Sequence, residues 1–123
     1  MAESIPVTRI EVPMSRINAI RDAVRSVTHL GEGPDASRLA RVEDAPALLA
    51  FLSDPAVHAP IYTLPRPLTE ASVEAFITEH LAEQADGEGL LFVREDGDGA
   101  IVGYSDIQVW PHWAAGELGG ARS

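Results

Sequence analysis

Apolar residues in the last third of the chain fall into short runs that flank a turn sequence. Residues 90–93 are all apolar, as expected of a strand covered on both faces, and residues 101–109 are rich in β-branched and aromatic side chains. Between them, residues 96–99 read Asp-Gly-Asp-Gly, and an Asp-Gly turn between two such runs is a strong hairpin signal. Residues 115–121 begin a third run, so the pattern predicts an antiparallel sheet here.

Earlier in the chain, two segments repeat apolar residues with the spacing of an amphipathic helix. We expect Asp44 to cap the first helix, and the second helix to begin after Thr69. Residues 56–68 lie between them and contain three prolines, which predicts an extended loop without helix. We expect the two helices and the hairpin to share one core, formed by Leu48, Leu49, Leu52, Phe76, Ile77, Leu81, Phe92 and Ile101.

Residues 1–36 form a separate leader in this interpretation. Ile5–Val12 has strand-like content with an internal proline, which favours an edge strand or an extended arm. A helix should follow, capped by Ser15, and its arginines indicate either a docking surface or an ordinary solvent-exposed face. Residues 29–36 are rich in glycine and proline, so we expect a boundary there, with residues 37–123 as the second segment. Two consecutive helices followed by a run of strands predict an α+β fold with a mainly antiparallel sheet.

The amino-acid composition excludes some kinds of chemistry and disfavours some kinds of partner. The chain has no cysteine, which removes thiolate chemistry, and its four histidines lack the spacing of metal ligands, so we expect no metal site. A net charge of −10 disfavours nucleic acid and anionic membranes as partners. No apolar run approaches the roughly 20 residues of a membrane span, and no signal-peptide pattern opens the chain, which predicts a cytoplasmic protein.

Four segments resemble, in order and spacing, the N-terminal half of GNAT-type N-acetyltransferases, in particular the branch that includes the ribosomal-protein N-terminal acetyltransferases. Arg38–Pro55 resembles the opening strand and first helix, and Thr69–Ile77 resembles the second helix. Ala100–Tyr104 resembles a strand segment of that branch, and Ala115–Gly119 resembles the start of its fourth strand. The resemblance covers residues 37–121 and implies a partial GNAT-like fold. It also implies acetyl transfer from acetyl-CoA to a primary amine, on a small molecule or at a protein N-terminus.

The same resemblance raises a question about the acetyl-CoA site. The family holds the pyrophosphate with a glycine-rich loop that opens a helix after the fourth strand, where backbone N–H groups and the helix dipole favour anions. The sequence stops at Ser123, before any such loop, and the acids of residues 96–99 would repel phosphate. The resemblance therefore implies a truncated acetyltransferase, with no cofactor-binding residues assigned. A complementing chain or a dimer would supply the missing half.

Two acids are candidates for contact with the acceptor amine. The resemblance places Glu117 on the fourth strand, where family members often carry an acid that faces the amine, so Glu117 is the candidate general base. The alternative is a carboxylate that lines the sheet or the surface. Asp106 lies on the preceding strand and could also meet the amine, although an outward-facing strand acid is the simpler interpretation.

Three aromatic residues are candidates for the acceptor pocket. Tyr62 lies in the loop between the two helices, which lines the acceptor site in the family. Trp110 and Trp113 flank Pro111 at the mouth of the sheet and would form a wall of the pocket. Each has a structural alternative, because a loop tyrosine can pack for stability and paired tryptophans can cap a sheet edge.

Two functional hypotheses remain open on the sequence alone. The first is an amine N-acetyltransferase whose other half is lost or supplied by another chain. The second is a non-catalytic half-domain that pairs its open sheet edge with a protein partner, because an uncovered edge strand is an aggregation liability.

Overall fold

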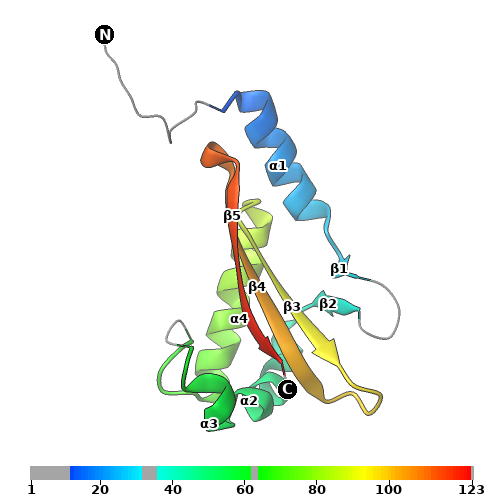
Figure 1. The fold of residues 1–123 in the computed structure, drawn as a ribbon, viewed down its shortest axis with the longest axis vertical. Helices are drawn as coiled ribbons and strands as arrows, with labels where there is room; N and C mark the ends of the chain where they lie inside the picture. Colours follow the sequence, from blue (N-terminus) through cyan, green and yellow to red (C-terminus); the bar gives the residue numbers. More distant parts are fainter. Residues whose placement is uncertain (1–11, 32–35, 62–63, 123) are drawn as a thin grey trace.

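The protein is described by a computed structural model that covers residues 12–31, 36–61 and 64–122. Its centre is a five-stranded antiparallel sheet in which each strand pairs with the next one along the chain (Figure 1). The predicted α+β class with an antiparallel sheet is confirmed. The strands are β1 (His29–Leu30), β2 (Ser37–Leu39), β3 (Gly89–Glu95), β4 (Ile101–Trp110) and β5 (Ala115–Arg122).

Helices cover both faces of this sheet. On one face lie α2 (Ala45–Leu52) and the longer α4 (Glu70–Ala85), while α1 (Met14–Ser26) packs on the other face. The division follows the alternation of side chains along β3. Leu91 and Val93 belong to the cluster under α2 and α4, whereas Leu90 and Phe92 pack with Val24 of α1. Both faces of β3 are therefore buried, which explains its uninterrupted apolar sequence.

The predicted hairpin between β3 and β4 is present. Val93 pairs with Tyr104, and the register shifts by one residue near Glu95. The turn is closed by the side chain of Asp96, whose Oδ1 accepts hydrogen bonds from the backbone N–H of Asp98 at 2.8 Å and Ala100 at 3.0 Å. This arrangement is the local reason why the Asp-Gly sequence ends one strand and starts the next.

The expectation of a single shared core is wrong in two places. Phe92 belongs to the separate cluster beneath α1, because it points to the opposite face of β3 from Leu91. Leu81 is 37% exposed, and His80 occupies the buried position on α4 instead. The larger cluster consists of Ala40, Ala45, Leu48, Leu52, Leu64, Val73, Phe76, Ile77, Leu91, Val93, Ile101 and Tyr104.

Helix boundaries agree with the sequence where local capping chemistry is strong. Thr69 caps α4 as expected, and the side chains of Thr69 and Ser72 bond to each other's backbone N–H at 3.0 and 2.9 Å. The cap predicted for α1 is wrong, because the helix begins at Met14 and includes Ser15. The loop predicted for residues 56–68 is also wrong at its start, where a four-residue helix, α3 (Pro55–His58), begins behind Asp54.

Asp44 precedes α2, as expected, but its side chain makes no cap bond to that helix. Its Oδ2 accepts the backbone N–H of Arg41 at 2.7 Å, across a short 3₁₀ turn at Val42–Asp44. Arg38 donates to both carboxylate oxygens of Asp44 at 2.8 Å. Asp44 therefore ties β2 to the start of α2 rather than capping the helix.

Within the leader, α1 packs closely on the rest of the chain. Arg21 of α1 donates to the backbone oxygen of Asp86 at 2.6 Å, and Arg25 donates to that of Ala85 at 2.8 Å. The last turn of α4 has no basic residue of its own, so these two arginines place positive charge at its negative dipole end. Two of the α1 arginines therefore bind the rest of the chain, while a docking role toward a partner stays a prediction.

The boundary predicted at residues 29–36 lies where β1 and β2, two neighbouring strands of the sheet, pair with each other. His29 of β1 pairs with Arg38 of β2, and Leu30 pairs with Ser37. The division into two segments therefore stays a prediction. The strand predicted at Ile5–Val12 lies outside the described residues except for Val12, which is in neither a helix nor a strand.

Candidate functional site

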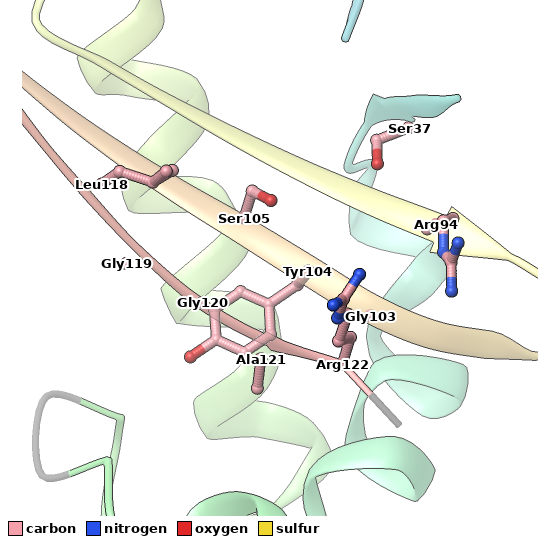
Figure 2. A pocket seen from close by; sticks show the side chains of 10 residues that line it. All are labelled: Ser37, Arg94, Gly103, Tyr104, Ser105, Leu118, Gly119, Gly120, Ala121 and Arg122. Carbon is pink, nitrogen blue, oxygen red and sulfur yellow. The ribbon is translucent and has the colours of Figure 1, made fainter. Parts of the chain in front are cut away.

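A hollow of about 600 Å³ opens on the face of the sheet opposite α4, along β4 and β5 (Figure 2). Ser105 and its register partner Gly120 lie on this face, and Gly103 and Arg122 pair beside them. Farther along the same face, Ile107 packs in the cluster that contains Val24 of α1. The hollow is thus a part of the sheet face that α1 leaves uncovered.

Glycines form much of the floor of the hollow. Gly120 has a φ of +141°, and a Cβ at this position would collide with the carbonyl oxygen of Tyr104. A Cβ at Gly103 would lie 3.2 Å from the carbonyl oxygen of Ala121. β4 and β5 therefore approach each other where side chains are absent, and backbone groups face the space above them.

The lining of the hollow combines positive charge with apolar surface. Arg94 and Arg122 both line it, which is notable in a chain with a net charge of −10. Ser37 and Ser105 add hydroxyl groups, and Leu118 contributes an apolar side chain that is 70% exposed. Such a lining suits an extended ligand with amide groups and some negative charge.

The outer edge of β5 borders the hollow. β5 is the last strand in the sheet order, and within residues 12–31, 36–61 and 64–122 it pairs only with β4. Half of the backbone N–H and C=O groups of an edge strand point away from its partner. An extended peptide-like chain can bond to this edge.

On the opposite face of the same two strands, the side chains of Asp106 and His80 bond to each other. His80 Nε2 lies 2.8 Å from Asp106 Oδ1, and His80 Nδ1 lies 2.8 Å from the carbonyl oxygen of Phe76. Burial by itself lowers the pKa of His80, but the bonds to Asp106 and Phe76 outweigh it and raise the pKa above its ordinary value. This contact was not predicted: the sequence pointed to Asp106 alone, and to His80 only as one of four histidines that lack the spacing of metal ligands. The sequence feature that could have identified His80 as a buried residue is its position four residues after Phe76, on the buried stripe of α4.

Glu117 shares this face with Asp106. Its register partner on β4 is Gln108, two residues along from Asp106, and side chains two residues apart point to the same side. Glu117 is exposed, while Gln108 donates to the backbone oxygen of Glu88 at 2.9 Å. The structure therefore brings the two candidate acids onto one face of the sheet.

The predicted tryptophan pair is found at the far end of β4. The rings of Trp110 and Trp113 stack at a centroid distance of 6.4 Å and line a second hollow of about 340 Å³. Tyr62 lies outside the described residues. Its described neighbours Ile61 and Leu64 pack against the cluster that contains Ile101, at the opposite end of β4. The loop near Tyr62 and the tryptophans thus do not lie together.

Comparisons with known proteins define the class. Residues 37–121 match the acetyltransferase (GNAT) domain family, and because this match spans more than half of the chain, the chain belongs to that family. Its fold is similar to the solved structure of ribosomal-protein-S5-alanine acetyltransferase from Vibrio fischeri, with a TM-score of 0.64 and 15% sequence identity. The similarity covers 78% of this chain and 56% of that chain, so this chain spans little more than half of that enzyme. A comparison with curated proteins found no match.

Two further observations concern the described residues alone. None of their helices is both long and apolar enough to cross a membrane. They also contain no group of three or more histidine, aspartate or glutamate side chains placed to hold a metal ion.

Proposed function

We propose that residues 37–122 form the strand side of an acetyl-CoA-dependent N-acetyltransferase site. The observation that carries this proposal is the hollow on the sheet face along β4 and β5, which borders an edge strand that pairs only with β4 among the described residues. The pantetheine arm of coenzyme A carries two amides in an extended chain, so it can bond to a strand edge as a peptide does. Gly103 and Gly120 keep the floor of the hollow free of side chains.

We further propose that the donors for the coenzyme A phosphates lie outside the described residues. None of the described helices opens with a glycine-rich loop, and the glycines of the hairpin turn stand beside Asp96 and Asp98. Arg94 and Arg122 offer positive charge in the hollow, but they do not replace a set of backbone N–H groups at a helix N-terminus. Residues outside the described ones or a second chain would supply that part.

The acceptor is proposed to be a primary amine at a protein N-terminus or on a small molecule. The solved relative is an acetyltransferase for an alanine of a ribosomal protein, which supports a protein amine. Glu117 remains the proposed base, and Trp110 and Trp113 remain proposed walls of an acceptor pocket. Tyr62, which lies outside the described residues, is also proposed to line the acceptor pocket.

A second candidate function follows from β5 itself. Its outer edge is unpaired among the described residues, and Leu118 beside it is 70% exposed. A non-catalytic module would use this edge to pair with a strand of another protein.

The affinity for two acetyl donors separates these proposals. We expect the purified chain to bind acetyl-CoA with a dissociation constant above about 1 mM, and S-acetylpantetheine, which lacks the nucleotide and its phosphates, within about tenfold of the same value. We also expect no acetyl transfer by this chain alone. Micromolar binding of acetyl-CoA in a calorimetric titration would show that the chain holds its own phosphate site. No binding of either donor would favour the non-catalytic module.

A further inference from the structure

His80 and Asp106 connect α4 to β4 beside the open edge of the sheet. His80 is buried, with 8% of its surface exposed, and both of its ring nitrogens lie 2.8 Å from oxygen acceptors. A neutral imidazole carries only one N–H, so it can donate to only one of these oxygens. With Asp106 ionised, the two contacts are satisfied together only when His80 is protonated, and Asp106 then has an imidazolium partner.

The contact with His80 engages only one of the two carboxylate oxygens of Asp106. Its side chain is 28% exposed, and the described residues provide no hydrogen-bond partner for it except His80, which bonds to Oδ1. Its neighbour across β3 is the buried Leu91, but its neighbour across β5 is Gly119, which has no side chain. A Cβ built at Gly119 would meet only the carbonyl oxygen of Asp106, at 4.0 Å. The space next to the carboxylate, above Gly119, is thus open.

This open space and the hollow lie on the two sides of the same strands. Asp106 follows Ser105, and Gly119 precedes Gly120, so the hollow and the carboxylate are on opposite faces. The two faces meet at the outer edge of β5. A donor held along that edge and an amine held at Asp106 would approach each other there.

We propose that Asp106 binds the ammonium group of the acceptor amine and that His80 is a positioning residue that holds the carboxylate in place. This inference rests on the proposed acetyltransferase function and adds the acceptor subsite to it. Glu117 lies on the same face and is exposed to solvent, so it remains available as the base for an amine that Asp106 has oriented.

The geometry couples amine binding to the protonation of His80. An imidazolium on Oδ1 and an ammonium on the open side of the same carboxylate are like charges close together, so each weakens the binding of the other, and the coupling is reciprocal. The acids that face His80 are Asp106 on β4 and Glu83 on α4. Two more acids, Glu79 and Glu88, lie near Glu83, and Arg21 of α1 pairs with Glu88 at 2.8 Å.

The direct test uses the unsubstituted 123-residue chain with propylammonium as the probe and propanol as its neutral counterpart. Propylammonium stays charged to about pH 10, as a lysine does. We expect it to shift the backbone amide signals of Asp106 and Gly119 and to lower the pKa of His80, measured from the imidazole nitrogen resonances. Its affinity should rise at least threefold as the pH passes upward through the pKa of His80. Propanol should do neither.

Two variants complete the test. Asp106→Asn should weaken propylammonium binding at least tenfold, whereas Asp98→Asn, the same change at an exposed hairpin acid, should leave it unaltered. Equal binding by Asp106→Asn, or an His80 pKa that propylammonium does not move, overturns the inference. If Asp106→Asn fails to fold, the His80 titration in the unsubstituted chain still decides. Because no acetyl donor is used, a failed donor-binding experiment and a failed amine site are distinguishable.

Discussion

Arg38 and Asp44 show how one ion pair organises the start of the family domain. The guanidinium of Arg38 contacts both carboxylate oxygens of Asp44 at 2.8 Å and also donates to Glu95 at 3.1 Å. Burial by itself raises the pKa of Asp44, but the bonds from Arg38 and Arg41 outweigh it and hold the pKa below its ordinary value. Together with Glu95 and the backbone N–H of Arg41, the pair connects β2, the hairpin and the turn before α2.

Substitution of Asp44 tests this role. Asp44→Asn should lower the free energy of unfolding by about 2–3 kcal/mol at pH 7, because Arg38 and the backbone N–H of Arg41 lose a charged acceptor. Asp22→Asn removes the exposed pair with Arg25 and should cost less than about 1 kcal/mol. Urea denaturation measures both.

The pH dependence of the same variants has a definite sign. Because folding lowers the pKa of Asp44, its contribution is present above the unfolded pKa of 3.8 and is lost as the pH falls through the folded value. The difference between the unsubstituted chain and Asp44→Asn should therefore shrink in acid. A difference that is unchanged from pH 7 to pH 3 would contradict the role assigned to the ion pair.

At the level of the secondary-structure elements, α1 and the turn that follows α4 lie so close together that no side chain fits between them. Gly87 has a φ of +74°, and a Cβ there would lie 2.5 Å from the Cβ of Arg21 and 2.6 Å from its Cα. The side chain of Gln84 also donates to the backbone oxygens of Val24 and Val27 at 3.2 and 3.1 Å. Close packing of α1 against the backbone at Gly87 thus holds the helix in place, together with the hydrogen bonds of its arginines.

Gly87→Ala should therefore loosen α1. We expect a loss of at least about 2 kcal/mol, because alanine resists the left-handed backbone and would overlap the backbone of Arg21. Gly97→Ala is the matched control, since a Cβ at that hairpin position meets nothing within 4 Å. Hydrogen exchange should show faster opening of α1 in Gly87→Ala alone. Protection of α1 equal in the two variants would show that the helix is held elsewhere.

The sequence correctly predicted those elements whose ends are set by hydrogen bonds between residues close together in the chain. The Asp96 turn and the Thr69 cap each depend on residues within four positions, so the hairpin and the start of α4 could be anticipated. The sequence did not predict α3, because the three prolines of residues 56–68 indicate a loop, although Pro55 in the first turn is compatible with a helix. His80 and Asp106 are 26 positions apart in the sequence, so no local sequence pattern predicts their contact.

For the whole molecule, the order of the elements predicted an antiparallel sheet with helices packed against it, and the family resemblance implied a fold of the same kind. It did not predict that α1 would occupy the other face, because that packing depends on contacts between residues about 60 positions apart. The hollow at β4 and β5 was not predicted either, since it arises from glycines on two strands whose register is known only in the fold. The difference between the two faces of the sheet, one covered by α2 and α4 and the other by α1 beside the hollow, is therefore known only from the structure.

The most direct test of the proposed donor site is a map of S-acetylpantetheine binding by backbone amide resonances. We expect the largest shifts at Gly103, Ser105 and Gly120, which line the hollow. Ser105→Tyr, which fills the hollow, should weaken binding at least about tenfold, or about 1.4 kcal/mol. Thr78→Tyr, the same enlargement on the exposed surface of α4, should leave binding unchanged. Shifts centred on the tryptophan pair, or equal binding by both variants, would contradict the account.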